Sequence, residues 1–104
     1  MKFIKKKSLK IYISSLDKYN NGILFEEILK VSTEMDGVTV LKGITSIGSR
    51  HIEHRFNILS VSQDLPIIIE IIDNETNIKD FLNKNSDMLK DSFITLSDVE
   101  VIEN

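Results

Sequence analysis

The sequence contains no cysteine, a single proline and four glycines among its 104 residues. The lack of cysteine excludes a disulfide framework, a thiolate zinc site, an iron–sulfur cluster and a cysteine nucleophile. No stretch approaches the roughly 18 apolar residues that a membrane-spanning helix needs. Residues 1–10 are basic but lack the unbroken apolar core and the cleavage site of a signal peptide. We therefore expect a soluble, cytoplasmic protein without membrane insertion.

The sequence also has little excess of charge of either sign. The formal net charge is -3, with 28% charged and 41% hydrophobic residues, which is ordinary for a globular protein. The electrostatic field of a protein with so small a net charge does not attract nucleic acid, although it does not exclude a local basic patch. We therefore expect no nucleic-acid partner. A chain of this length builds one hydrophobic core, so we expect a single domain over residues 1–104.

The chain begins with the pattern of a strand. Apolar and polar residues alternate from Leu9 to Ile13, which predicts a strand with one buried face. Lys5 to Lys7 precede it. We interpret these lysines as a solvated tail that protects a sheet edge, rather than as a patch that contacts phosphate or membrane.

A helix is expected next. Apolar residues recur at helical spacing between residues 24 and 35, which predicts an amphipathic helix. Asn20 or Asn21 is expected to cap its start. Gly37 follows directly and is expected to take the left-handed conformation beyond the helix end.

The last third of the chain repeats this plan in the order helix, strand. Asp73 or Asn74 is expected to cap a helix that reaches Leu89 and has a polar, irregular middle at residues 83–87. Ser92 to Ile102 then alternates as a strand. Asp98 lies between its two halves and indicates a bulge or a bend.

Between these outer parts lie two strands joined by a long excursion. Val38 to Ile44 predicts a strand, and Gly43 near its end indicates a bulge, a bend or the close approach of another group. Residues 46–55 are polar and aperiodic, which predicts a loop. The run from Pro66 to Ile72 is almost continuously apolar, so we expect a strand that is buried on both faces.

This order predicts an α+β fold of the ferredoxin-like βαββαβ type, a four-stranded antiparallel sheet with two helices on one face. Two short helices cover only one side of such a sheet. The isoleucine run indicates that the other side also avoids water. Burying each of these side chains is favourable by about 1.5 to 3 kcal/mol. We therefore expect copies of the chain to associate through their sheets.

Several segments resemble a known family. They are T-V-L-K-G at Thr39 to Gly43, D-L-P-I-I-I-E-I-I-D at Asp64 to Asp73, and D-V-E-V-I at Asp98 to Ile102. With I-Y-I in the first strand and D-K-Y at Asp17 to Tyr19, they resemble the uncharacterised PII-like family. This family of unknown function is grouped with the nitrogen-regulatory PII signalling proteins. The similarity spans residues 9–102.

The resemblance implies a regulatory homotrimer with a long loop, the T-loop, after the second strand. In PII proteins nucleotides bind in the clefts between subunits, beside the base of this loop, and the loop contacts a protein target. The target here is unknown, and a membrane transporter or an enzyme is expected. Gly43 and Gly48 match glycines at the loop base. Ser46 departs from the pattern, since relatives usually have glycine there, and the loop has no match to the lysine or tyrosine that PII proteins modify covalently.

The candidate ligand-binding residues gather around this loop. They are Lys42, Gly43, Ser46, Gly48, Arg50 and Arg55. Arginine and lysine bind anions, and the resemblance makes an adenine nucleotide the expected effector. The alternative is a surface loop whose charges serve solubility. No Gly-rich P-loop is present, so a nucleotide must be held in another way.

Both histidines lie in the same loop. His51 and His54 flank Glu53 at a spacing that could hold a zinc or copper ion on one helical turn. Such a site would make the protein a metal-binding trimer that resembles the copper-tolerance proteins of this architecture. We favour a solvated polar loop without a metal, because two histidines without a fixed helix or further ligands are weak evidence.

Glu70 interrupts the isoleucine run and needs a partner. We expect it to meet a cation at a subunit interface, or to point to solvent at a sheet edge. No catalytic set emerges, because the serines lie in no nucleophile elbow and no third group orients a histidine. We therefore expect a regulatory protein rather than an enzyme. The alternatives are the metal-binding trimer and a ligand-free interaction scaffold.

Overall fold

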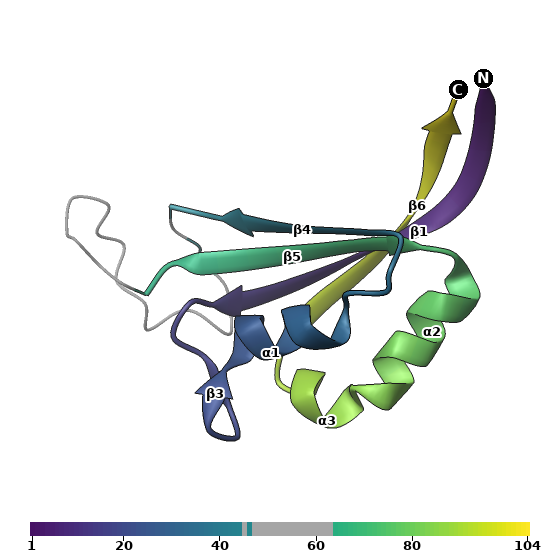
Figure 1. Ribbon diagram of the computed structural model, residues 1–104. Helices are drawn as coiled ribbons and strands as arrows, with labels where there is room; N and C mark the ends of the chain where they lie inside the picture. Colours follow the sequence, from purple (N-terminus) through teal and green to yellow (C-terminus); the bar gives the residue numbers. More distant parts are fainter. Residues whose placement is uncertain (45, 47–63) are drawn as a thin grey trace.

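The structure is a computed structural model that describes residues 1–44, 46 and 64–104. The strands of its main sheet are β1 (Lys2–Ser14), β4 (Gly37–Lys42), β5 (Pro66–Asp73) and β6 (Phe93–Glu103). They are antiparallel and lie in the order β4-β5-β1-β6. The helices are α1 (Leu24–Val31), α2 (Glu75–Lys84) and α3 (Ser86–Leu89). The helices lie on one face of the sheet (Figure 1), which confirms the predicted α+β, ferredoxin-like fold class.

The core lies between this sheet and the helices. Every second residue of β5 is buried, as expected for a strand that is covered on one side. The buried apolar residues are Leu9, Ile11, Ile13, Ile67, Ile69 and Ile71 from the strands and Leu24, Ile28, Ile78, Phe81 and Leu89 from the helices. Ile11 lies opposite Ile69 in the register, and both are 0% exposed. This pair marks the centre of the core.

Within a single chain, β5 is covered on one face only, and the predicted burial of its second face would have to come from another copy of the chain. Ile68 and Ile72 alternate with the buried residues of β5, so they lie on the face away from the helices, here called the outer face, and remain partly exposed. The continuous isoleucine run concealed an ordinary alternation, because apolar residues occupy both faces. In the described ranges, the helices lie on the opposite face of the sheet (Figure 1).

A two-stranded sheet that the sequence did not predict connects β1 to α1. It consists of β2 (Lys18–Tyr19) and β3 (Gly22–Ile23). Asn20, with a φ of 54°, turns the chain between these strands. Asn20 and Asn21 therefore form a hairpin turn instead of capping the helix, and the N-cap of α1 is Ile23.

α1 is shorter than predicted. It ends at Val31, where the hydroxyl of the next residue, Ser32, donates to the Leu29 carbonyl oxygen at 3.2 Å and offers the backbone an alternative to further helix. Met35 lies beyond the helix and packs against the core. Gly37 is the first residue of β4, and no glycine in the described ranges has a positive φ, so its predicted left-handed role is wrong. None of the helices in the described chain is long and apolar enough to cross a membrane.

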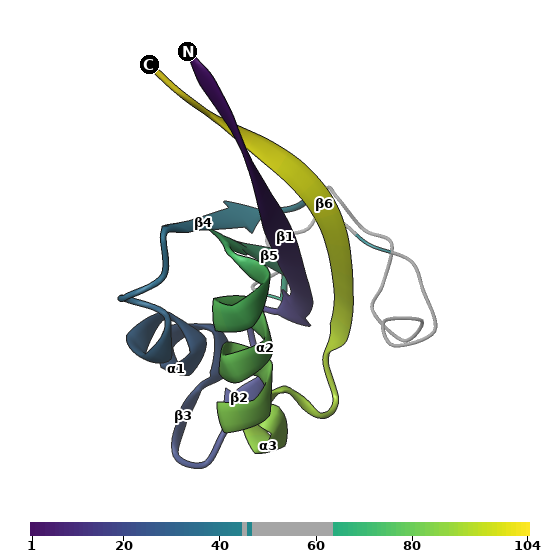
Figure 2. The same ribbon diagram turned by 90° about the vertical axis from the view of Figure 1, so that its right-hand side faces the viewer.

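β1 and β6 continue past the end of β5 as a ribbon that carries both termini (Figure 2). Lys2 lies opposite Glu103 in this ribbon. Lys5 to Lys7 are part of the paired strand β1, so their interpretation as a solvated tail is wrong. The pairing runs without interruption through Asp98, which lies opposite Lys7, and the predicted bulge is absent from this described strand.

Two adjacent residues fix the start of α2. Asn74 is the N-cap, as predicted, and its side chain accepts from the Asn77 amide at 2.8 Å. The Asp73 carboxylate is 1% exposed. Its Oδ1 accepts from the Asn74 amide at 2.7 Å and from the Asn77 side chain at 2.9 Å, and its Oδ2 accepts from the Asp36 amide at 3.0 Å. Asp73 thus joins β5, α2 and the segment before β4.

Candidate functional site

The base of the predicted loop is formed by the end of β4 and the start of β5. The Gly43 amide donates to the Pro66 carbonyl oxygen at 2.7 Å. A Cβ added to Gly43 would stand 2.9 Å from Pro66 Cγ. Gly43 is therefore required because the proline ring lies against it, which is the close approach that the sequence indicated.

The end of β1 holds the same loop base from the other side. The Ser15 amide donates to the Leu65 carbonyl oxygen at 2.8 Å, and the Leu65 amide donates to Ser15 Oγ at 2.9 Å. The hydroxyl of Ser14, which is 2% exposed, hydrogen-bonds the Asp64 carboxylate. Both arms of the loop are thus anchored to the sheet. Sequence reasoning missed Ser14 and Ser15, because two serines at a strand end carry no periodic signal.

Three of the predicted ligand-binding residues lie at this base. Lys42 is the last residue of β4 and is exposed, while Gly43 and Ser46 are partly buried. Gly48, Arg50 and Arg55 lie outside the described residues, as do His51 and His54. Within the described ranges, no group of three or more histidine, aspartate or glutamate side chains is placed to hold a metal ion.

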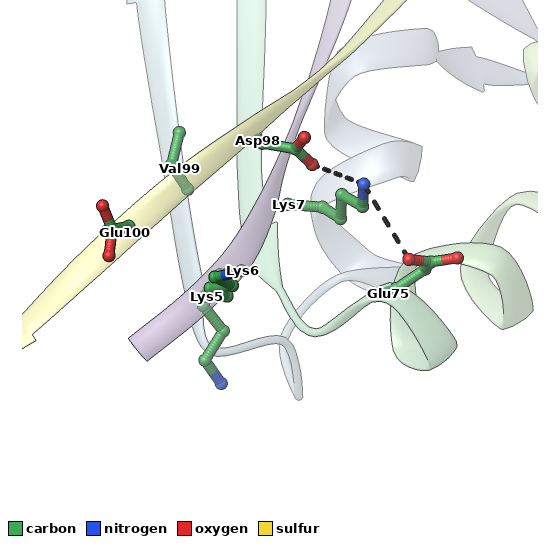
Figure 3. Close-up of a pocket in the computed structure, with 7 residues that line it drawn as sticks. All are labelled: Lys5, Lys6, Lys7, Glu75, Asp98, Val99 and Glu100. Atoms are coloured by element: carbon green, nitrogen blue, oxygen red, sulfur yellow. Dashed lines mark hydrogen bonds and ion pairs between the residues drawn. The ribbon is translucent and has the colours of Figure 1, made fainter. Parts of the chain in front are cut away.

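A pocket of about 470 Å³ lies where β1 and β6 of the ribbon meet the start of α2. It is lined by Lys5, Lys6, Lys7, Glu75, Asp98, Val99 and Glu100 (Figure 3). Lys7 Nζ lies 2.5 Å from Asp98 Oδ1 and 3.8 Å from Glu75 Oε1. Lys6 Nζ lies 2.7 Å from Asp36 Oδ2.

The charges of this pocket are largely matched by one another. The hydrogen bond from Lys7 lowers the pKa of the Asp98 carboxyl and raises the pKa of Lys7 itself. The hydrogen bond to Asp36 likewise raises the pKa of Lys6. Because Lys6 and Lys7 already have carboxylate partners, we interpret the pocket as a junction between the ribbon and α2 rather than as an anion site.

The close approach at Gly43 leads to a stability prediction. Gly43→Ala is expected to lower the free energy of unfolding by about 1 to 3 kcal/mol, because the Pro66 ring cannot swing away from the new Cβ. Gly37→Ala is the matched control, since its Cβ would meet Ile72 Cβ at 3.8 Å, an ordinary contact. Urea unfolding of both variants checks this. Equal stability of the two variants would contradict it.

Sequence relatives cover nearly the whole chain. The family model DUF190, described as "Uncharacterized ACR", matches residues 6–101. A UPF0166 protein of Methanocaldococcus jannaschii is 37% identical over 101 residues, which cover 94% of this chain and 93% of that protein. A UPF0166 protein of Aquifex aeolicus is 32% identical over 104 residues, with 98% of each chain covered.

Solved structures share the fold at low sequence identity. CPII of Thiomonas intermedia K12, bound to ADP, AMP and acetate, has a TM-score of 0.69 at 16% identity, with 99% of this chain and 94% of that chain covered. A putative PII-like signalling protein of Thermus thermophilus also has a TM-score of 0.69, at 19% identity, with 98% and 94% covered. The fold is therefore PII-like, and the resemblance found in the strand segments is confirmed.

Proposed function

This chain belongs to the DUF190 family of uncharacterised proteins, and from this membership and its PII-like fold we propose that it is a non-enzymatic regulatory protein that binds an adenine nucleotide. The proposed assembly is a homotrimer. The nucleotide lies in the clefts between subunits, beside the base of the loop. Its binding redistributes the conformations of the loop, which contacts a protein target.

The anchored loop base is the observation that carries this proposal. A loop that regulates a partner needs ends that are fixed to the body of the protein. Here the hydrogen bond from Gly43 to Pro66 and those between Ser15 and Leu65 fix both ends to the sheet. Among proteins of this fold, CPII of Thiomonas intermedia K12 has been solved with ADP and AMP and with ADP and bicarbonate. These structures support a small anionic effector for this chain.

The chemistry of the described residues suits an anion at this place. The ammonium group of Lys42 is exposed directly beside Gly43, and lysine binds phosphate as a compact positive charge. Arg50 and Arg55 follow in the chain and stay predicted ligands. A ligand that binds one loop conformation more tightly than the others shifts the loop population toward that conformation.

Nucleotide binding predicts a thermal shift. With ADP, AMP, ATP or a cyclic adenine nucleotide at about 100 times its dissociation constant, the free energy of unfolding is expected to rise by about 2.7 kcal/mol, which raises Tm. Lys42→Ala should weaken nucleotide binding roughly tenfold, which corresponds to a loss of about 1.4 kcal/mol of binding free energy. Differential scanning fluorimetry and titration calorimetry measure both quantities.

A matched lysine on the helical side provides the control. Lys79 lies in α2, and its ion pair is with Glu75 of the same helix, so Lys79→Ala should leave nucleotide affinity unchanged. No shift of Tm across the nucleotide panel would contradict the proposed ligand. Equal losses of affinity in the Lys42 and Lys79 variants would contradict its proposed place.

A further inference from the structure

The β2–β3 hairpin forms a two-stranded sheet of its own beside the main sheet. Lys18 pairs with Ile23 in this hairpin, and Tyr19 pairs with Gly22. A two-stranded hairpin is at best marginally stable alone in water, so the contacts around it decide its conformation. The hairpin is therefore expected to respond to changes in the residues that hold it.

The base of the hairpin is joined to the arm of the loop that leads into β5. The buried hydroxyl of Ser14 donates to the Asp64 carboxylate of this arm and accepts from the Leu16 amide at 3.2 Å. The Ser14 amide donates to the Asp17 side chain at 2.9 Å, and the Asp17 carbonyl oxygen accepts from the Leu24 amide at 2.8 Å. Asp17 and Leu24 directly precede and follow the hairpin. A series of hydrogen bonds thus leads from the arm to both ends of the hairpin.

The hairpin is also tied to α3. The Tyr19 hydroxyl donates to Asp87 Oδ2 at 2.9 Å, and the Tyr19 side chain packs against the core. This hydrogen bond raises the pKa of the Tyr19 phenol, so the hydroxyl keeps its proton at neutral pH. The hairpin and α3 lie next to each other in the lower part of Figure 2. The hairpin therefore links the arm of the loop to the segment that leads into β6.

We infer that the β2–β3 hairpin is coupled to the arm of the loop, so that a change in the arm alters the hairpin and its contact with α3. A serine hydroxyl has one hydrogen, and in Ser14 this hydrogen is donated to Asp64. If the arm moves away, a hydroxyl that is 2% exposed loses this bond, which is unfavourable. The same hydroxyl holds the Leu16 amide at the entry to the hairpin, so the two contacts strengthen one another.

The use of this coupling in regulation rests on the proposed function. A nucleotide that fixes the loop base would also fix the hairpin, and the hairpin would offer a partner protein a second surface that reports the bound ligand. Coupling between two sites is reciprocal, so a partner that binds the hairpin would change the nucleotide affinity by the same factor.

Hydrogen exchange of single amides measures the coupling. In Ser14→Ala, the Leu24 amide at the end of the hairpin is expected to exchange roughly tenfold faster than in the native chain, because a buried hydrogen bond is lost. Ser32→Ala is the matched control, since Ser32 is also buried but lies at the other end of α1. An unchanged rate at Leu24 in Ser14→Ala, or an equal increase in Ser32→Ala, would overturn the coupling.

Tyr19→Phe tests the coupling from the opposite direction, because it removes the bond to Asp87 and keeps the ring. The Leu65 amide, which donates to Ser15 Oγ in the arm of the loop, should then exchange several-fold faster. Tyr12→Phe is the control, since Tyr12 is the other tyrosine of the chain and lies in β1. An unchanged rate at Leu65 in Tyr19→Phe would refute the coupling even if Ser14→Ala did not fold.

ADP separates this inference from the proposed function. When calorimetry shows ADP binding, ADP should slow exchange at Leu24 in the native chain, and it should do so much less in Ser14→Ala. Bound ADP without any change at Leu24 would overturn the transmission to the hairpin. Absence of ADP binding together with the expected effect of Ser14→Ala would contradict the proposed ligand and support the coupling.

Discussion

Asp73→Ala is expected to lower the free energy of unfolding by about 3 to 5 kcal/mol, enough to unfold much of a marginally stable domain. The carboxylate is 1% exposed and accepts three hydrogen bonds, from Asn74, Asn77 and Asp36. Removing it leaves these donors without an acceptor at the point where β5, α2 and the segment before β4 meet. Urea unfolding at neutral pH measures the loss.

The same carboxylate makes stability depend on pH. Burial raises the pKa of the Asp73 carboxyl, but its hydrogen bonds and the nearby charge of Lys6 lower it more, so the folded-state pKa lies below the ordinary value. A lowered pKa stabilises the fold above the unfolded-state pKa, and this stabilisation is lost as the pH falls through the folded-state pKa. The native chain should therefore lose stability below about pH 4, and the Asp73→Ala variant should lose less over that range.

An exposed aspartate in the same helix region provides the control. Asp80 lies in α2 and is exposed, so Asp80→Ala should change the free energy of unfolding by less than about 0.5 kcal/mol. If the Asp73 and Asp80 variants were equally stable at neutral pH, the junction role of Asp73 would be wrong.

Neighbouring isoleucines on opposite faces of β5 are expected to respond in opposite ways to the same change. Ile69→Asp buries a carboxylate in the core, where Ile69 is 0% exposed, and is expected to abolish folding. Ile68→Asp places the charge on the outer face of the sheet, where the side chain is partly exposed. This variant should remain folded and should dissociate into single chains.

Circular dichroism and sedimentation velocity together distinguish the two outcomes. The Ile68→Asp variant should keep the far-ultraviolet spectrum of the native chain and sediment as a single copy. Thr39→Asp, also on the outer face but on the edge strand β4, should weaken assembly less because Thr39 is already exposed. An Ile68→Asp variant that unfolds, or one that assembles like the native chain, would contradict the expected association of copies through the outer face.

Much of the fold could be predicted because its signals are local. The alternation from Leu9 to Ile13, Pro66 at the start of β5 and Asn74 at the start of α2 each reflect the geometry of their own element. The first helix was placed correctly at Leu24 but extended too far. The helix ends beside a hydrogen bond from Ser32 to Leu29. The apolar pattern from which the length of the helix was predicted continues past this bond.

What the sequence did not disclose depends on residues that are far apart in the chain. Lys6 pairs with Asp36 and Lys7 with Asp98, so only the folded register shows why these lysines belong to a strand. At the loop base, Gly43 was identified as unusual. Its neighbour Pro66 is separated from it by the whole loop, and the ring contact follows from the β4 to β5 pairing rather than from any motif.

The isoleucine run also depends on the whole fold for its interpretation. A continuous apolar strand predicts burial on both faces, but it does not say whether the second cover comes from the same chain. The structure shows that Ile67, Ile69 and Ile71 are buried, while Ile68 remains partly exposed. The order of the strands and the position of the helices decide this, and both are properties of the whole fold.

Sedimentation velocity of the native chain over the micromolar range tests most directly whether the outer face binds sister copies. The mass of one chain is 11.9 kDa. We predict one stable species with three times this mass, and its conversion to single chains by Ile68→Asp. A folded native chain that sediments as a single copy throughout this range would show that the outer face stays uncovered and that no clefts between subunits exist to hold a nucleotide.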